Sequence, residues 1–220
     1  MRCLYCHNPD TWDVKKGTPV EAAELITQYQ KNKAFYSKGG LTVTGGEPLL
    51  QLSFLEELLT LAKQQGIHTC LDTSASSYIP QNNEQQAQLE RILKNTDLVL
   101  LDIKHIDPEK HRALTGMDND RVLRFARLLD EKGVSMWIRH TVVAGYTDDE
   151  PSLRELGRFI GTLRHVKALD VLPYHTMGVA KYRELGIRYP LEGLPPLSKE
   201  AAVTAREHIL NGIREVRRKA

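Results

Sequence analysis

The sequence predicts an α/β protein built on a parallel sheet. Segments with strand character alternate with segments of helical periodicity along the 220 residues, which is the pattern of repeated βα units. Residues 98–101 form a continuous apolar run, as expected for a parallel strand buried on both faces. No composition break marks a linker, so we expect one domain over residues 1–220.

A helix is the first element expected after the N-terminal cysteines, from residue 19 to about residue 36. Thr18 can cap this helix, Pro19 suits its first position, and Glu21 completes a capping box. The segment that follows is rich in glycine and ends it.

The later helices are predicted from apolar residues at helical spacing, and the strands from short apolar runs between them. Gly66 and Gly133 stand where two helices end, and Ser198 stands where the last one begins. In chain order the elements are strand 41–44, helix 52–65, strand 67–72, helix 84–94, strand 98–101, helices 108–114 and 119–132, strand 134–143, helix 150–163, strand 166–172 and helix 198–218.

Charged or titratable side chains stand at or near the ends of these strands. In chain order they are Glu47, Asp72, Asp102 with Lys104, Arg139 and His175. Helix caps and loop charges explain any one of them, but a parallel barrel gathers reactive groups at the carboxyl ends of its strands. The glycines at 45 and 46 would let a polar ligand approach the backbone. Asp102 and Lys104 either pair with each other or hold the charged ends of a zwitterion.

Cys3 and Cys6 present two thiols from one short turn. The spacing suits a c-type haem with His7, a thiol oxidoreductase, a zinc site or an iron–sulfur cluster, and it also fits two ordinary cysteines. A haem of this kind implies export, and no signal peptide is recognised. A zinc ribbon needs a second ligand pair, which the sequence lacks. Iron–sulfur ligation is therefore the favoured interpretation, with Cys70 a buried strand residue and not a ligand.

The composition narrows the classes of partner. The net charge of +2 gives no electrostatic reason to expect nucleic acid. No apolar run reaches the roughly 18 residues of a membrane span. We therefore expect a cytoplasmic, monomeric protein with no membrane or nucleic-acid partner.

Five short motifs occur together along the chain. They are Cys-Leu-Tyr-Cys-His-Asn at 3–8, Thr-Gly-Gly-Glu-Pro at 44–48, His-Thr-Cys-Leu-Asp-Thr at 68–73, Leu-Leu-Asp-Ile-Lys at 100–104 and Leu-Pro-Tyr-His at 172–175. In this order and spacing, the sequence resembles the pyruvate formate-lyase-activating enzymes, a family of the radical S-adenosylmethionine (SAM) superfamily. The resemblance covers essentially the whole sequence.

This resemblance implies a fold, a reaction and partners. The implied fold is a partial (β/α)6 barrel of TIM type, with the first strand missing from this chain. A [4Fe–4S] cluster cleaves SAM reductively, and the resulting 5′-deoxyadenosyl radical removes a hydrogen atom from a glycine of pyruvate formate-lyase. The implied electron donor is a flavodoxin.

The resemblance also assigns roles to matching residues. Cys3 and Cys6 correspond to two of three cluster ligands, and with Lys104 they are the expected catalytic residues. The positions that correspond to cofactor binding are Tyr5, Cys6, His7, Gly45, Gly46, Glu47, Asp72, Asp102, Ile103, Lys104, Arg139 and His175. A monovalent cation is expected near Asp72 and Asp102.

The family's first cluster cysteine would stand four residues before Cys3. We therefore expect an N-terminally truncated chain that holds iron poorly and is inactive or incomplete as an enzyme. Two alternatives stay open. One is a non-catalytic fragment that keeps the SAM pocket or a partner surface, and the other is an activase of a different glycyl radical enzyme. No Cys-rich insert follows His7, which favours the pyruvate formate-lyase type.

Overall fold

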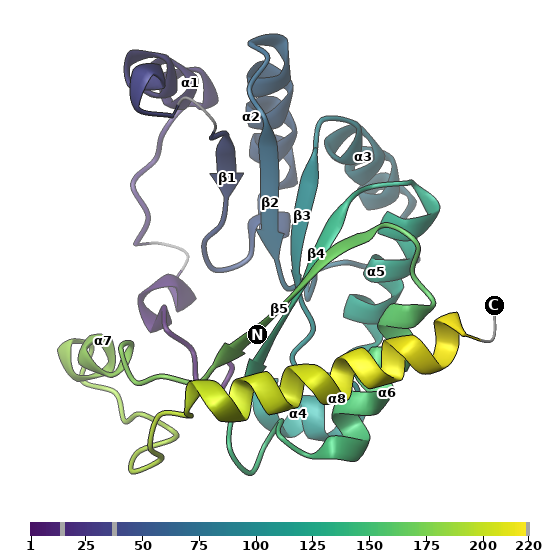
Figure 1. Cartoon of the computed structure of the whole chain (residues 1–220). Coiled ribbons are helices and arrows are strands. Elements are labelled where there is room, and N and C mark those ends of the chain that lie inside the picture. Colours follow the sequence, from purple (N-terminus) through teal and green to yellow (C-terminus); the bar gives the residue numbers. More distant parts are fainter. Residues whose placement is uncertain (14–15, 37–38, 219–220) are drawn as a thin grey trace.

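The computed structural model describes residues 1–13, 16–36 and 39–218. Five strands form one sheet in the order β1-β2-β3-β4-β5, and every neighbouring pair is parallel. The strands are β1 (Leu41–Val43), β2 (Thr69–Thr73), β3 (Leu98–Asp102), β4 (Met136–Val142) and β5 (Val166–Pro173). Because spatial order follows chain order, the sheet is wound in one direction, as in a segment of a barrel (Figure 1). The predicted α/β fold with five parallel strands is confirmed.

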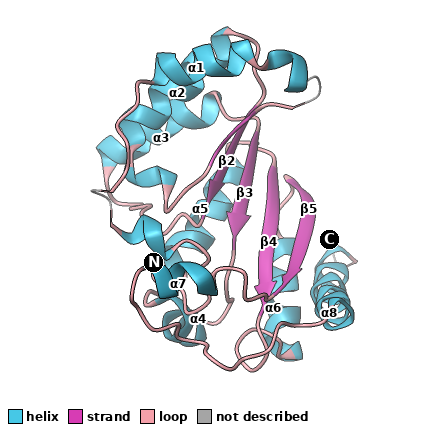
Figure 2. Cartoon of the chain, turned by 90° about the vertical axis from the view of Figure 1, so that its left-hand side faces the viewer, coloured by secondary structure: helices cyan, strands magenta, loops and turns pink. Residues whose placement is uncertain are grey.

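Helices connect the strands and lie along the sheet (Figure 1). The α-helices are α1 (Ala22–Lys31), α2 (Leu52–Gln64), α3 (Asn83–Lys94), α4 (Pro108–Thr115), α5 (Asp120–Glu131), α6 (Glu150–Gly161), α7 (Val179–Glu184) and α8 (Lys199–Arg217). Three short 3-10 helices are η1 (Pro9–Trp12), η2 (Lys33–Tyr36) and η3 (Pro48–Leu50). The strands point to the end of the molecule where the N-terminus, α4 and α7 lie (Figure 2).

The main core lies between one face of the sheet and the helices. Val99 and Leu101 of β3 are buried in it, together with Met136 and Ile138 of β4. Burial along β3 alternates, so Leu98 and Leu100 on the other face are only partly covered. The expectation that residues 98–101 are buried on both faces is therefore wrong. Trp137, on the less covered face of β4, remains 43% exposed.

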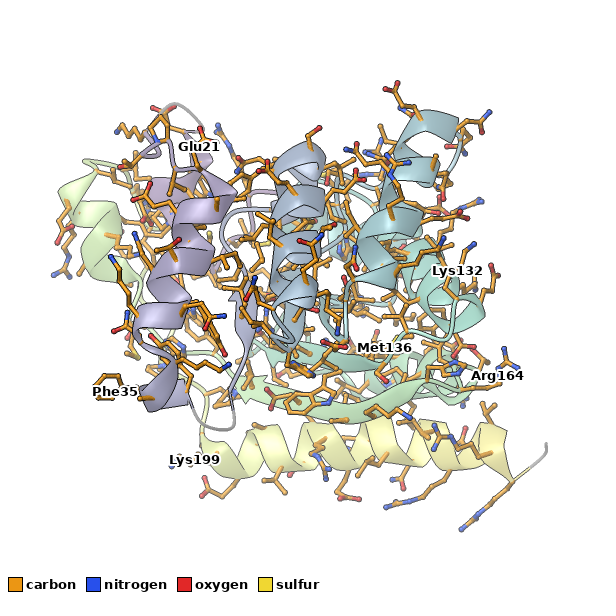
Figure 3. All side chains as sticks on the ribbon, turned by 90° about the horizontal axis from the view of Figure 1, so that it is seen from above. Glu21, Phe35, Lys132, Met136, Arg164 and Lys199 are labelled. Atoms are coloured by element: carbon orange, nitrogen blue, oxygen red, sulfur yellow. The ribbon has the colours of Figure 1, made fainter. Side chains whose placement is uncertain are left out.

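The first helix is shorter than predicted. Glu21 is extended and caps α1 without a side-chain hydrogen bond, so the capping box at 18–21 does not form. The chain tightens into η2 after Lys31, and Phe35 extends into solvent from this segment (Figure 3). Ser198 caps α8 as predicted, by accepting a hydrogen bond from the Ala201 N–H. The short helix α7 has no counterpart among the predicted elements.

Two glycines allow α8 to pack closely on α6. A Cβ atom on Gly157 would lie 2.0 Å from the backbone oxygen of Ile209, and one on Gly212 would lie 2.1 Å from that of Arg154. The helix α8 runs from Lys199 alongside β5 (Figure 3). In the described part of the chain, no helix has the length and apolar character needed to cross a membrane.

Candidate active site

The two N-terminal cysteines lie in a closed turn at the carboxyl end of the sheet. The Cys6 N–H donates a hydrogen bond of 3.1 Å to the Cys3 carbonyl oxygen. The N–H groups of Arg2 and Leu4 donate to the carbonyl oxygens of Thr115 and Leu114, which fixes the turn to the end of α4. Both thiols are free. Burial raises the pKa of the Cys3 thiol, and the positive charge of Lys104 partly offsets that effect.

Groups from three strand ends meet the cysteine turn and the η1 segment that follows it. The Lys104 ammonium, after β3, lies over the Tyr5 ring, 5.4 Å from its centroid. A Cβ atom on Gly46, after β1, would lie 3.2 Å from the Thr11 hydroxyl oxygen, so η1 packs directly on the glycine turn. The imidazole of His175, after β5, stacks on that of His7.

Four charged side chains form one network beside this turn. The Arg139 guanidinium donates hydrogen bonds of 2.6 Å to Asp102 and 2.6 Å to Asp72. The Lys104 ammonium donates one of 3.0 Å to Asp102. Thr44, at the end of β1, donates to Asp72 at 3.3 Å. The network therefore ties the ends of β1, β2 and β3 to the middle of β4.

Electrostatics keeps this network charged. Burial would raise the pKa of Asp102, but Lys104 and Arg139 outweigh it and hold that pKa at about 2. Burial likewise opposes the charge of Lys104, and the Asp102 carboxylate outweighs it, raising the pKa of Lys104 well above its usual value. The two side chains are only 16% and 13% exposed. Asp102 and Lys104 therefore form the mutual ion pair that was one of their two predicted roles.

Protein donors occupy both carboxylate oxygens of Glu47 with hydrogen bonds. Its carboxylate accepts hydrogen bonds from the Thr73 hydroxyl, from the Leu49 N–H, and from both the N–H and hydroxyl of Ser74. The residue is 9% exposed. This carboxylate therefore ties the glycine turn after β1 to the end of β2, which leaves the backbone of Gly45 and Gly46 as the open polar surface.

Other predicted site residues lie farther from this surface. The Ile103 side chain is in the core, its N–H donates to Arg139, and its carbonyl oxygen accepts from His140. Ile103 thus spaces Asp102 and Lys104 without presenting a free polar group. Cys70 is buried in β2, as expected. Within residues 1–13, 16–36 and 39–218, no three metal-binding side chains gather at one point.

Sequence reasoning missed several residues that shape this site. Thr73 and Ser74 follow the predicted Asp72, and their hydroxyls hold Glu47. Their position at the end of β2 and directly after it was the available signal. Tyr182 and Lys181 come from α7, whose six residues are too short for a periodicity signal.

Comparison with known proteins identifies the class to which this half-barrel with a terminal cysteine turn belongs. The family model described as Radical SAM superfamily matches residues 1–156, so the chain belongs to the radical SAM superfamily. Among its relatives is a pyruvate formate-lyase-activating enzyme from Staphylococcus aureus (strain USA300), 46% identical over 212 residues. That match covers 95% of this chain and 84% of the relative.

Solved structures agree with this assignment. A domain of a pyruvate-formate lyase-activating enzyme from Bacteroides vulgatus ATCC 8482 superposes with a TM-score of 0.62 and 26% identity. The match covers 79% of this chain and 94% of that domain. Streptococcus suis SuiB bound to S-adenosylmethionine shares the fold, with a TM-score of 0.67 and 16% identity over 97% of this chain and 45% of SuiB.

The superfamily implies an iron–sulfur cluster and SAM, and the residues present fit both. Cys3 and Cys6 offer two free thiols from one closed turn, and thiolates are the usual ligands of such clusters. Among the described residues, the buried hydroxyl of Tyr182 has no protein partner, and Tyr182 belongs to the same side-chain cluster as Cys3. The open backbone of the glycine turn and the Lys104 ammonium suit the polar ends of an amino acid.

Proposed function

We propose that this protein activates pyruvate formate-lyase by reductive cleavage of SAM at a [4Fe–4S] cluster. The observation that supports the proposal best is the contact of the cysteine turn and η1 with groups after β1, β3 and β5, namely Gly46, Lys104 and His175. A cysteine pair on its own suits several metals, whereas this combination of a thiol turn, an open glycine turn and a charged network suits a cluster that binds an amino acid.

The chain's own residues bind, orient and shield. Cys3 and Cys6 supply two thiolate ligands to the cluster. When bound, the cluster supplies the electron that cleaves SAM, and the radical so released takes a hydrogen atom from a glycine of the partner. Gly45 and Gly46 would offer backbone carbonyl groups to the SAM amino group, and Lys104 would pair with its carboxylate. These contacts would orient SAM before the reaction starts.

Tyr5, His7 and His175 form the remaining wall of the site. Tyr5 is buried within the cysteine turn, and the imidazoles of His7 and His175 stack next to it. We assign them to the adenosine part of SAM and to the exclusion of water. Arg139 acts through Asp72 and Asp102, which it holds in position.

Further parts of the proposal concern a cation and the partners. A monovalent cation near Asp72 and Asp102 would bind beside the Arg139 guanidinium, which already lies between these carboxylates. We propose a flavodoxin as the electron donor and a cytoplasmic monomer with one radical SAM domain.

The test is anaerobic reconstitution with iron and sulfide, followed by SAM, a reductant and pyruvate formate-lyase. It is run on the chain as it stands and on a form whose cysteine motif is completed by an N-terminal extension. We expect 5′-deoxyadenosine and a glycyl radical signal from the completed form, and neither when Cys6 is replaced by Ala. Radical formation only on another glycyl radical enzyme would change the substrate assignment. Iron and SAM binding without cleavage would favour a non-catalytic binding protein.

A further inference from the structure

The short helix α7 is fastened onto the cysteine turn by three contacts. A Cβ atom on Gly178, at the start of α7, would lie 2.8 Å from the His7 Cα atom, so the two backbones touch. The Lys181 ammonium donates hydrogen bonds of 2.8 Å to Asn8 and 3.0 Å to Asp10. These contacts join α7 to residues 7–10, although more than 170 residues separate the two segments in sequence. The helix therefore covers the cysteine turn.

Tyr182 is the residue that α7 brings into this contact. Tyr182 is 1% exposed. Its ring makes an edge-to-face contact with the Trp12 ring, with the centroids 5.8 Å apart. Tyr182 also belongs to the buried cluster that contains Cys3, against which Cys6 packs. Packing on both sides fixes the ring, so its hydroxyl has a fixed direction.

The Tyr182 hydroxyl has no hydrogen-bond partner among the residues that the structure describes. The hydroxyls of Tyr174 and Tyr189 in the same cluster differ, because they bond to each other at 2.9 Å, whereas that of Tyr5 also has no partner among the described residues. A buried polar group without a partner is costly, and such groups in native proteins usually meet a ligand or ion. Its partner is therefore a water molecule or a bound group.

Sulfur is the acceptor that the surroundings provide. Tyr182 shares a buried cluster with Cys3, Cys6 packs against that cluster, and a Cβ atom on Gly178 would lie 3.3 Å from the Cys6 carbonyl oxygen. A phenol is protonated at neutral pH, so the hydroxyl can donate within the cluster that holds the two sulfur atoms. Anionic sulfur accepts such hydrogen bonds, and they tune the potential of iron–sulfur centres.

We propose that the Tyr182 hydroxyl donates a hydrogen bond to a sulfur atom of the metal centre held by Cys3 and Cys6. This inference rests on the proposed iron–sulfur site and adds a positioning residue that acts on it. A donor next to sulfur stabilises the more negative, reduced state of a cluster, so Tyr182 raises its reduction potential. The helix α7 would then both cover the cysteine turn and adjust the driving force for electron transfer.

The test compares Tyr182→Phe with Tyr174→Phe in the reconstituted protein with the completed cysteine motif. Each variant loses one hydroxyl from the same aromatic cluster, but the one on Tyr174 is already paired with Tyr189. We expect the midpoint potential, measured by titration with paramagnetic resonance detection, to become more negative in Tyr182→Phe alone, at unchanged iron content. Equal potentials in the three proteins, or the same shift in both variants, would overturn the inference.

A second measurement uses cobalt and the 220-residue chain without iron. Co²⁺ bound by thiolates gives a sulfur-to-metal charge-transfer band in the near ultraviolet. Loss of a hydrogen bond to sulfur should move this band to longer wavelength in Tyr182→Phe and leave it in place in Tyr174→Phe. Identical bands would count against the hydrogen bond. Neither measurement needs SAM or pyruvate formate-lyase, so failure of the proposed function would be seen separately, as a missing glycyl radical.

Discussion

The imidazole rings of His7 and His175 stack with their centroids 4.0 Å apart and their planes 19° from parallel. His7 Nε2 also lies 3.2 Å from the His175 carbonyl oxygen. This contact joins the cysteine turn to the segment after β5. Burial lowers the pKa of His7, although its bond to His175 partly opposes that effect. A protonated His7 is therefore disfavoured in the folded protein.

Stability should fall as the pH drops below about 6.5, the usual histidine pKa. Burial lowers the pKa of His7, His105, His111 and His140 in the folded state. Between the lowered folded-state pKa and 6.5, the unfolded chain binds more protons than the folded one, so acid favours unfolding. The contribution of these neutral histidines to the free energy of unfolding is therefore fully present above pH 6.5 and is lost as the pH falls. Urea denaturation at a series of pH values measures this. His7→Gln should flatten the dependence, and equal slopes for the two proteins would show that His7 does not contribute.

Replacing Gly157 with Ala should destabilise the protein by about 1–3 kcal/mol, the usual cost of overpacking. The added methyl group would lie 2.0 Å from the Ile209 carbonyl oxygen, which is helix backbone and cannot move aside. Gly17→Ala is the matched control, because its Cβ would meet nothing within 4 Å. Denaturant unfolding of Gly157→Ala and Gly17→Ala measures the free energy of unfolding of each variant. Equal values would show that α6 and α8 can move apart at little cost.

Lys104→Ala should weaken SAM binding by about 1.5–3 kcal/mol while leaving iron content near normal, since it removes one partner of a charge-assisted contact. Lys110→Ala is a suitable control, because Lys110 forms a more exposed ion pair with Asp149. Equilibrium binding of SAM to the reconstituted protein gives the answer. An unchanged affinity would show that Lys104 serves only its ion pair with Asp102.

Cys3→Ala or Cys6→Ala should abolish a reconstituted cluster, whereas Cys70→Ala should not. Cys70 is a buried residue of β2, so its loss should cost stability alone, on the order of 1 kcal/mol. The iron-to-protein ratio and the broad iron–sulfur absorbance report the difference. Loss of iron in Cys70→Ala with an intact fold would make Cys70 a ligand and refute the two-cysteine turn.

The sequence allowed the parallel sheet and its polar strand ends to be predicted, because both leave local patterns. Asp72 and Asp102 could be named from their places near strand ends, and Arg139 from its charge within a predicted strand. Their common network could not, since it depends on how three strands line up in space. The saturation of Glu47 was hidden for the same reason, as its main partners lie 26 and 27 residues away.

The helix α7 and the one-sided burial of β3 were missed for different physical reasons. Six residues give less than two helical turns, so α7 carries no clear periodicity. The apolar run of β3 looks the same whether one or both faces are covered, because burial depends on which side the helices take.

The docking of α7 on the cysteine turn also sets the order in which the site can form during synthesis. The thiols of Cys3 and Cys6 leave the ribosome first, whereas Gly178 and Tyr182, which cover them, leave about 170 residues later. At roughly 5–20 residues per second, the turn stays uncovered for some ten seconds or more. Throughout that interval the two thiols lack the cover that α7 gives them in the folded protein.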